Sequence, residues 1–321
     1  MPDPIHISIA MAAAALVAAA MAGVVWLAGR RFAPGSNVLP SVGWLLGIAA
    51  GHYVGVWWLG LLPNLQLAEA SSRMFWMVLP AVLVVELLGV VPKVPQALVW
   101  LLRAALALTV TRVLLHGSTY VANSGSGGDS AQPMSFWVLA LLVAGGLLLV
   151  WVAVRSSTPL RSACPAPLVL SAVALASSIA IMLSGYATGG QLGLPLAASL
   201  AGVFAIALWR GKVSDATPTV GYAVIAIGSL LIIGHYFAEL KAPHALLLAA
   251  SPLVALVPTV PVLGRVPRWG RVAGSLALVL VPLALVLQQA GQTFVERSAP
   301  TGQSSSTPSQ ASVSDYMSFG K

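Results

Sequence analysis

Charged residues are scarce in this sequence. Of 321 residues only 7% are charged, whereas 58% are hydrophobic, and the mean hydropathy is +0.92. Soluble globular domains carry about a quarter charged residues, so this composition excludes an ordinary water-solvated domain. A chain this apolar is expected to use the lipid bilayer as its solvent, and a lipid-embedded chain of this kind folds as helices. The predicted fold class is therefore all-α, a polytopic bundle of transmembrane helices.

Cysteine and the usual catalytic motifs are also nearly absent. The single cysteine, Cys164, excludes intrachain disulfides and cysteine clusters for zinc or iron–sulfur groups. The sequence contains no Gly-x-Ser-x-Gly, no His-Glu-x-x-His, no phosphate-binding glycine loop and no Cys-x-x-Cys-His for haem attachment. These absences favour a role other than catalysis, without deciding it.

Basic residues outnumber acidic residues, and the formal net charge is +8. The basic residues stand singly or in small groups between apolar runs, and they form no patch or stripe that could follow a phosphate backbone. Nucleic acid is therefore excluded as an expected partner. Basic residues in short connections are instead typical determinants of membrane topology.

Ten apolar runs are long enough to cross a hydrocarbon core of roughly 30 Å as helices. The expected spans are 7–29, 40–62, 74–91, 96–115, 134–154, 166–187, 191–209, 218–238, 245–263 and 272–290. Prolines interrupt three of these spans: Pro80 the third, Pro195 the seventh, and Pro252 with Pro258 and Pro261 the ninth. Proline in a membrane helix more often produces a kink than an end, since neighbouring groups can satisfy the carbonyl it leaves unpaired.

The basic residues give an independent test of this count. With the N-terminus outside, the inner connections hold Arg30, Arg31, Lys93, Arg155, Arg161, Arg210, Lys212, Arg265, Arg268 and Arg271. The outer side holds Arg73, Lys241, Arg297 and Lys321. This asymmetry follows the positive-inside rule along the whole chain and predicts both termini on the outer face. The first span has Asp3 before it and Arg30 after it, the reverse of a cleavable signal peptide, so we expect it to be retained.

These features predict a multi-pass protein of the cell membrane, of the bacterial inner-membrane type. One transmembrane domain would comprise residues 1–290, and its two sets of five spans, 1–154 and 166–290, would be inverted relative to each other if they are repeats. The tail 291–321 is polar and predicted to be flexible, as is the Ser/Gly-rich stretch Asn123–Ser130.

Two charged residues are expected to pair inside the membrane. Glu86 lies near the inner end of span three and Arg103 near the inner end of span four, and the turn Pro92–Pro95 joins these spans as a hairpin. A rise of about 1.5 Å per residue places both charges at a similar depth. A Glu86–Arg103 ion pair would serve either as a structural clamp, which we favour, or as a gate or proton-linked carboxylate.

A second polar group is expected at the outer ends of spans four and eight. Arg112 and His116 are four residues apart, and His235 and Glu239 repeat that spacing. If the two spans are neighbours, this outer cluster would line a vestibule, together with Glu69 and Arg73 from the connection ahead of span three. The alternative is that helix ends simply become polar where they meet lipid headgroups.

His52 lies alone at the middle of span two. A histidine at this depth can bind substrate, relay protons or ligate a metal or haem, or it can be a neutral ring bonded to a backbone carbonyl. A bis-histidine haem needs a second histidine at the same depth, which no other span offers at its centre. His116 and His235 would make such a pair only near the outer face, so haem stays open but is not favoured.

Three functional classes follow from these residues. The first is a transporter or permease for a small solute, suggested by the five-plus-five division and the proline-interrupted spans. The second is a non-catalytic membrane subunit or scaffold that binds protein partners through packed helices or through the C-terminal tail. The third is a redox or haem subunit that uses the histidines. We weakly favour the transporter.

Overall fold

The computed structural model describes residues 3–32, 38–118, 136–156, 165–210, 217–255 and 268–298. The stretch Asn123–Ser130, Cys164, the last part of the ninth expected span and residues 299–321 of the tail lie outside the described residues. The described residues are helical apart from turns and short connections.

The helices follow one another along the chain with few connecting residues. They are α1 (Pro4–Phe32), α2 (Val38–Trp58), α3 (Ala70–Arg73), the π-helix η1 (Met74–Val78), α4 (Leu79–Val90), α5 (Gln96–Leu115), α7 (Phe136–Ser156), α9 (Pro165–Leu183), α10 (Ala187–Gln191), α11 (Leu194–Arg210), α12 (Thr217–Phe237), α13 (Ala242–Val254) and α14 (Arg268–Ser298). No strand occurs among the described residues, which confirms the all-α class for this part of the chain.

Nine helical segments of the described chain are long and apolar enough to cross a membrane. They correspond to the first eight expected spans and the tenth. The ninth expected span is represented by α13, an apolar helix of 13 residues, which is shorter than a full crossing. The chain is thus compatible with a multi-pass membrane protein.

The last helix is longer than the sequence predicts. We expected the tenth span to end at residue 290, whereas α14 continues to Ser298. Gln288 and Gln289 are polar positions at which a helix can leave the membrane, but the next proline is Pro300, so no helix-breaking ring follows them within α14. Residues 291–298 of the predicted polar tail are therefore helical.

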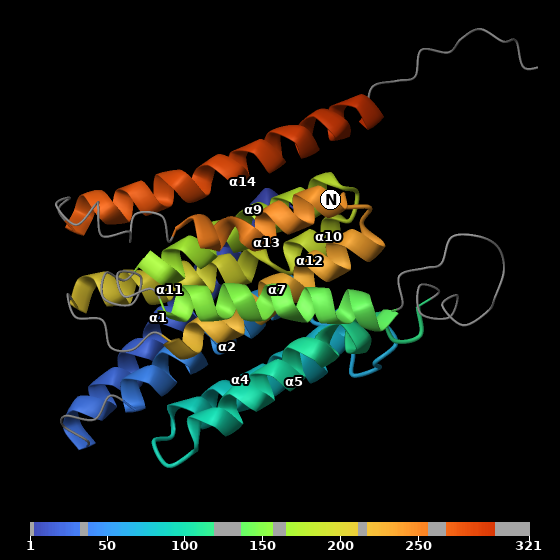
Figure 1. Ribbon diagram of the computed structural model, residues 1–321. Coiled ribbons are helices and arrows are strands. Elements are labelled where there is room, and N and C mark those ends of the chain that lie inside the picture. Colours follow the sequence, from blue (N-terminus) through green and yellow to red (C-terminus); the bar gives the residue numbers. More distant parts are fainter. Residues whose placement is uncertain are drawn as a thin grey trace, which may run out of the picture.

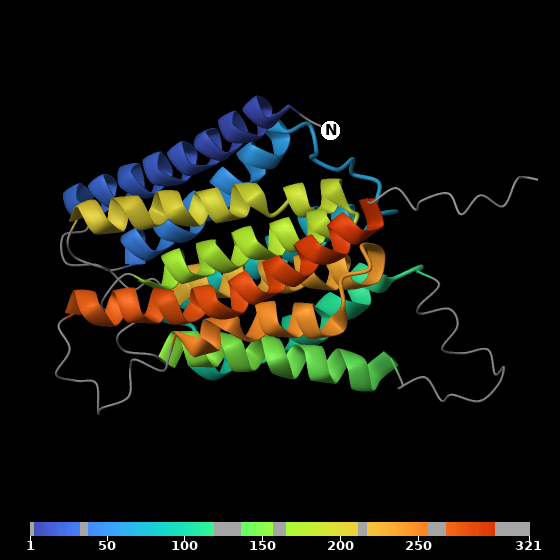
Figure 2. The same ribbon diagram turned by 90° about the horizontal axis from the view of Figure 1, so that it is seen from above.

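The long helices lie side by side in one bundle (Figure 1, Figure 2). α12 forms the centre, with 83% of its apolar stretch buried, whereas the corresponding values are 22% for α1 and 28% for α14. A helix that is apolar on all sides suits either the centre of a bundle or contact with lipid, so packing rather than composition separates these helices.

Small residues allow α1 and α2 to pack closely. Glycines recur every fourth residue on one face of α2, and a Cβ atom added to Gly47 or Gly51 would lie 2.7 Å from the Ala18 carbonyl oxygen or 2.5 Å from that of Ala14. Such stripes of small residues let helix backbones approach one another in a membrane, where apolar burial alone gives little driving force.

Two spans are interrupted near the expected prolines. Pro80, at the start of α4, cannot donate a hydrogen bond to the carbonyl of residue 76, and residue 76 lies within the π-helix η1. Pro195 likewise cannot donate to residue 191, where α10 ends, and two residues separate α10 from the start of α11. Both interruptions provide backbone carbonyls for contacts outside their own helix.

Candidate functional site

The structure brings Glu86 of α4 and Arg103 of α5 together. Arg103 Nε donates to Glu86 Oε1 at 2.8 Å and Arg103 Nη2 donates to Glu86 Oε2 at 3.0 Å. The exposed fractions of the Arg103 and Glu86 side chains are 1% and 0%. The two parallel hydrogen bonds match the planar fork of the guanidinium to the carboxylate, the strongest geometry for such a pair.

Aromatic rings and glycines surround this ion pair. The Arg103 guanidinium carbon lies 4.9 Å from the centre of the Trp100 ring and 5.2 Å from that of Trp151. A Cβ atom on Gly221 of α12 would lie 2.6 Å from the Glu86 carboxyl carbon. The pair is thus enclosed by protein, a packing that suits a clamp between helices better than a group that exchanges protons.

His52 of α2 is fully buried and both ring nitrogens have partners. Nε2 lies 3.1 Å from the Leu192 carbonyl oxygen, and Nδ1 lies 3.2 Å from the Tyr222 hydroxyl. A carbonyl only accepts hydrogen bonds, so Nε2 carries the hydrogen, and in the neutral ring Nδ1 accepts from Tyr222. With both nitrogens engaged, neither is available in this arrangement to ligate a haem iron.

The neighbouring residue, Tyr53, makes a similar contact. Its hydroxyl donates to the carbonyl oxygen of Phe75, within η1. Leu192 lies between α10 and α11, so His52 and Tyr53 bond to carbonyls at the two interrupted spans. Two adjacent residues of α2 therefore form hydrogen bonds with both irregular segments, η1 and the connection between α10 and α11.

The four residues of the expected outer cluster do not meet at one site. Arg112 is exposed and lies over the Trp137 ring, with its guanidinium carbon 5.3 Å from the ring centre. His235 Nδ1 lies 2.7 Å from the Leu240 carbonyl oxygen. Glu239 forms an exposed ion pair with Arg297 at 3.3 Å. Each of these three side chains has its own separate partner.

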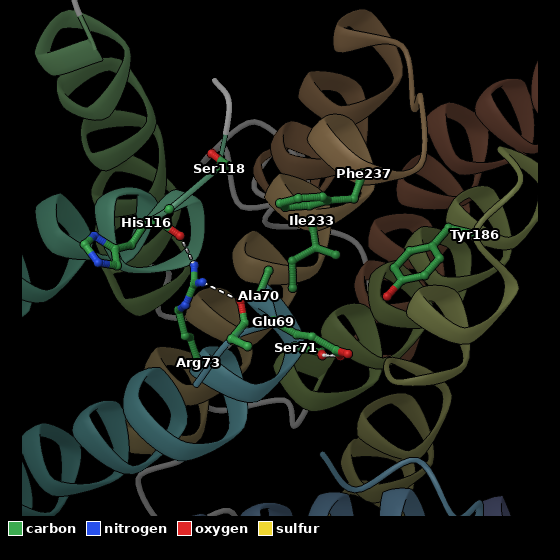
Figure 3. A pocket seen from close by; sticks show the side chains of 11 residues that line it. Glu69, Ala70, Ser71, Arg73, His116, Ser118, Tyr186, Ile233 and Phe237 are labelled. Carbon is green, nitrogen blue, oxygen red and sulfur yellow. Dashed lines mark hydrogen bonds between the residues drawn. The ribbon is translucent and has the colours of Figure 1, made fainter. Parts of the chain in front are cut away.

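A different pocket lies at this end of the bundle, and Figure 3 shows it. We call it the vestibule pocket; its volume is about 320 Å³. Its lining residues are Ala68, Glu69, Ala70, Ser71, Arg73, His116, Gly117, Ser118, Tyr186, Ile233 and Phe237. Of the expected outer cluster only His116 takes part, and its ring points away from the Arg73 guanidinium (Figure 3).

Arg73 forms a buried positive charge at the edge of this pocket, with 9% of the residue exposed. Its Nε donates to the Leu67 carbonyl at 2.9 Å, its Nη2 to that of Ala68 at 2.6 Å, and its Nη1 to that of Leu114 at 3.0 Å. Nη1 also contacts the carbonyl of His116. Arg73 thereby caps the C-terminal end of α5, whose exposed carbonyls favour a cation.

Glu69 precedes α3 and lines the same pocket without pairing with Arg73. The Glu69 Oε2 atom accepts a hydrogen bond from Ser71 Oγ at 3.1 Å. Glu86 pairs with Arg103 and Glu239 pairs with Arg297, whereas no ion pair joins Glu69 to Arg73. The vestibule pocket therefore carries a carboxylate and a guanidinium that do not form an ion pair with each other.

Tyr186 forms another wall of the pocket, and the sequence alone did not single it out. Gly185 has φ +107°, a backbone conformation that favours glycine, and it sets the turn ahead of Tyr186. A Cβ atom on Gly189 would overlap the Tyr186 ring, so the absence of a side chain there leaves room for the ring. The run Gly185-Tyr186 followed by Gly189-Gly190 was the available sequence signal.

Comparisons with protein-family models, with curated proteins and with solved structures found no match to this chain. Among the described residues, no group of three or more His, Cys, Asp or Glu side chains could hold a metal ion.

Proposed function

We propose that this protein is a membrane permease for a small polar solute and that the vestibule pocket is where the solute first binds. The observation that carries the proposal is the buried charge of Arg73, which faces this pocket with carbonyl partners and no carboxylate within ion-pair distance among the described residues. A pocket of about 320 Å³ suits a small molecule.

The interrupted helices support this proposal. α3 and Tyr186, ahead of α10, flank the pocket; α3 continues into the π-helix η1, and α10 is separated from α11 by two residues. Transporters commonly build solute sites where membrane helices are discontinuous, since the unpaired backbone groups there can bind a solute. In this conformation the carbonyls of Leu192 and Phe75 accept hydrogen bonds from His52 and Tyr53. We therefore assign these two contacts the role of a closed barrier to the solute.

We also propose ten spans with both termini outside, so that the vestibule pocket opens outward. The basic residues of the sequence support this orientation. Cys164, in an expected inner connection, allows a direct test with a membrane-impermeant maleimide. It should stay unlabelled in intact cells and react after permeabilisation, whereas Ser304→Cys in a Cys164→Ser background should react in intact cells. Labelling of Cys164 in intact cells would contradict this orientation.

A scaffold subunit is the second candidate. The enclosed Glu86–Arg103 pair favours it, since this part of the interior is packed as a static contact between helices. The five-plus-five inverted arrangement remains a prediction, and the redox alternative gains no support from His52.

Uptake of radiolabelled solutes into proteoliposomes tests the permease. We expect saturable uptake of at least one small polar solute, and we expect Ala68→Trp, which adds a bulky ring to the lining of the vestibule pocket, to reduce it at least tenfold. Ala104→Trp, on an exposed face of α5, is the matched control and should leave uptake unchanged. Absence of uptake across amino acids, sugars and organic acids, together with a stable co-purifying partner, would favour the scaffold.

A further inference from the structure

We infer that the vestibule pocket binds a zwitterion, a small molecule with an oxyanion and an ammonium group; this inference rests on the proposed function. The same chemistry occurs in free amino acids and in the ethanolamine phosphate head group of lipids. The inference comes from the separate placement of the charges of Glu69 and Arg73.

Glu69 and Arg73 are four residues apart at the start of a helix, a spacing that normally allows an acid and a base to pair. Here Arg73 bonds to carbonyls of the 67–68 connection and of α5, whereas Glu69 bonds to Ser71. In Figure 3 the Arg73 guanidinium lies on the His116 side, and the Glu69–Ser71 pair lies toward Tyr186. The contacts with α5 thus hold the two charges apart within one pocket.

The Arg73 side of the pocket suits an oxyanion. Nη2 carries two N–H groups and has one carbonyl partner, Ala68, among the described residues. An arginine forms short, charge-assisted hydrogen bonds to a carboxylate or phosphate, and burial strengthens them by removing competing water.

The opposite side suits an ammonium group. Glu69 Oε2 accepts one hydrogen bond from Ser71, while Oε1 has no partner among the described residues. The Tyr186 hydroxyl points toward this side of the pocket (Figure 3) and adds an acceptor oxygen. An ammonium group carries three N–H donors, which these oxygens can accept.

The wall that α12 contributes is apolar. Ile233 and Phe237 lie one turn apart on α12 and line the pocket together with Ala70. A substituent on the bound zwitterion would contact these side chains, so we expect an amino acid with an aliphatic side chain to bind more tightly than glycine.

The test measures calorimetric binding to the full-length protein in detergent, using leucine, leucinamide, 4-methylpentanoate and phosphoethanolamine. We expect leucine to bind and leucinamide and 4-methylpentanoate, which each lack one charge, to bind at least tenfold more weakly. Stronger binding of phosphoethanolamine than of leucine would also support the zwitterion and would identify a lipid head group as its source.

The variant for this test is Glu69→Gln, because Glu69 is exposed and its substitution leaves the cap on α5 in place. We expect it to weaken leucine binding at least tenfold without weakening 4-methylpentanoate. The matched control is Glu239→Gln, an exposed acid outside the pocket, which should change neither. Equal binding of leucine and 4-methylpentanoate by the unmodified protein, or no effect of Glu69→Gln, would overturn the inference.

Binding and uptake separate the inference from the proposed function. Leucine binding without uptake would support the zwitterion site and contradict the permease. Uptake of an uncharged solute without binding of any of the zwitterions would support the permease and contradict this inference.

Discussion

The Nε2 atom of His52 lies 3.1 Å from the Leu192 carbonyl oxygen, at the interruption between α10 and α11. A break in a membrane helix leaves polar backbone groups that lipid cannot satisfy, so another helix must supply a donor. His52 does so with one nitrogen and accepts from Tyr222 with the other. His52 thus has the geometry of a neutral ring bonded to a backbone carbonyl, one of the alternatives that the sequence leaves open.

Tyr222→Phe tests this hydrogen-bonded histidine. The substitution removes the donor to Nδ1 while keeping the ring, and an unsatisfied buried polar atom costs about 1–3 kcal/mol. We expect the free energy of unfolding in mixed micelles to fall by about this amount. Tyr186→Phe, which removes a half-buried hydroxyl at the vestibule pocket, is the control, and an equal loss in both variants would argue against the His52 contact.

The Glu86–Arg103 pair calls for a double-mutant cycle. Removing one partner of a buried ion pair leaves an uncompensated charge and typically costs about 3–5 kcal/mol. Glu86→Gln and Arg103→Gln should therefore each lower the free energy of unfolding strongly, and the double substitution should recover part of the loss. Strictly additive losses would show that the two residues act independently.

Gly221→Ala should destabilise the packing of α12 against the Glu86–Arg103 pair. Its Cβ atom would lie 2.6 Å from the Glu86 carboxyl carbon, closer than real Cβ atoms approach such groups. Overpacking typically costs about 1–3 kcal/mol, so we expect a lower unfolding midpoint. Gly145→Ala is the matched control, because its Cβ atom would meet nothing within 4 Å, and it should be neutral or stabilising.

The sequence predicts the Glu86–Arg103 contact because a tight hairpin fixes the relative depth of the two residues. Hydropathy likewise locates the membrane-length helices, since apolar length determines them directly. Of the residues that the sequence assigns to an outer vestibule, Glu69, Arg73 and His116 line the pocket, whereas its remaining wall could not be predicted. Its shape depends on the turn at Gly185 and on the approach of Tyr186 to α3, which are set by tertiary packing. Arg112 does not line the pocket, because its side chain contacts Trp137 of α7 instead. Helical spacing alone does not show which neighbouring helix a long side chain will contact.

Glu239 has φ +55°, in the left-handed region that favours glycine, and its carboxylate pairs with Arg297 at the surface. The strain and the ion pair oppose each other, because the left-handed conformation costs roughly 1–2 kcal/mol for a residue with a Cβ atom, whereas an exposed pair contributes about 0–1 kcal/mol. Glu239→Ala and Glu239→Gly both remove the ion pair, but only glycine relieves the backbone strain. We therefore expect Glu239→Gly to be more stable than Glu239→Ala by about 1 kcal/mol in parallel unfolding titrations. Equal stabilities would mean that the backbone at this position relaxes when the carboxylate is removed, so that the conformation depends on the ion pair with α14 rather than on the turn itself.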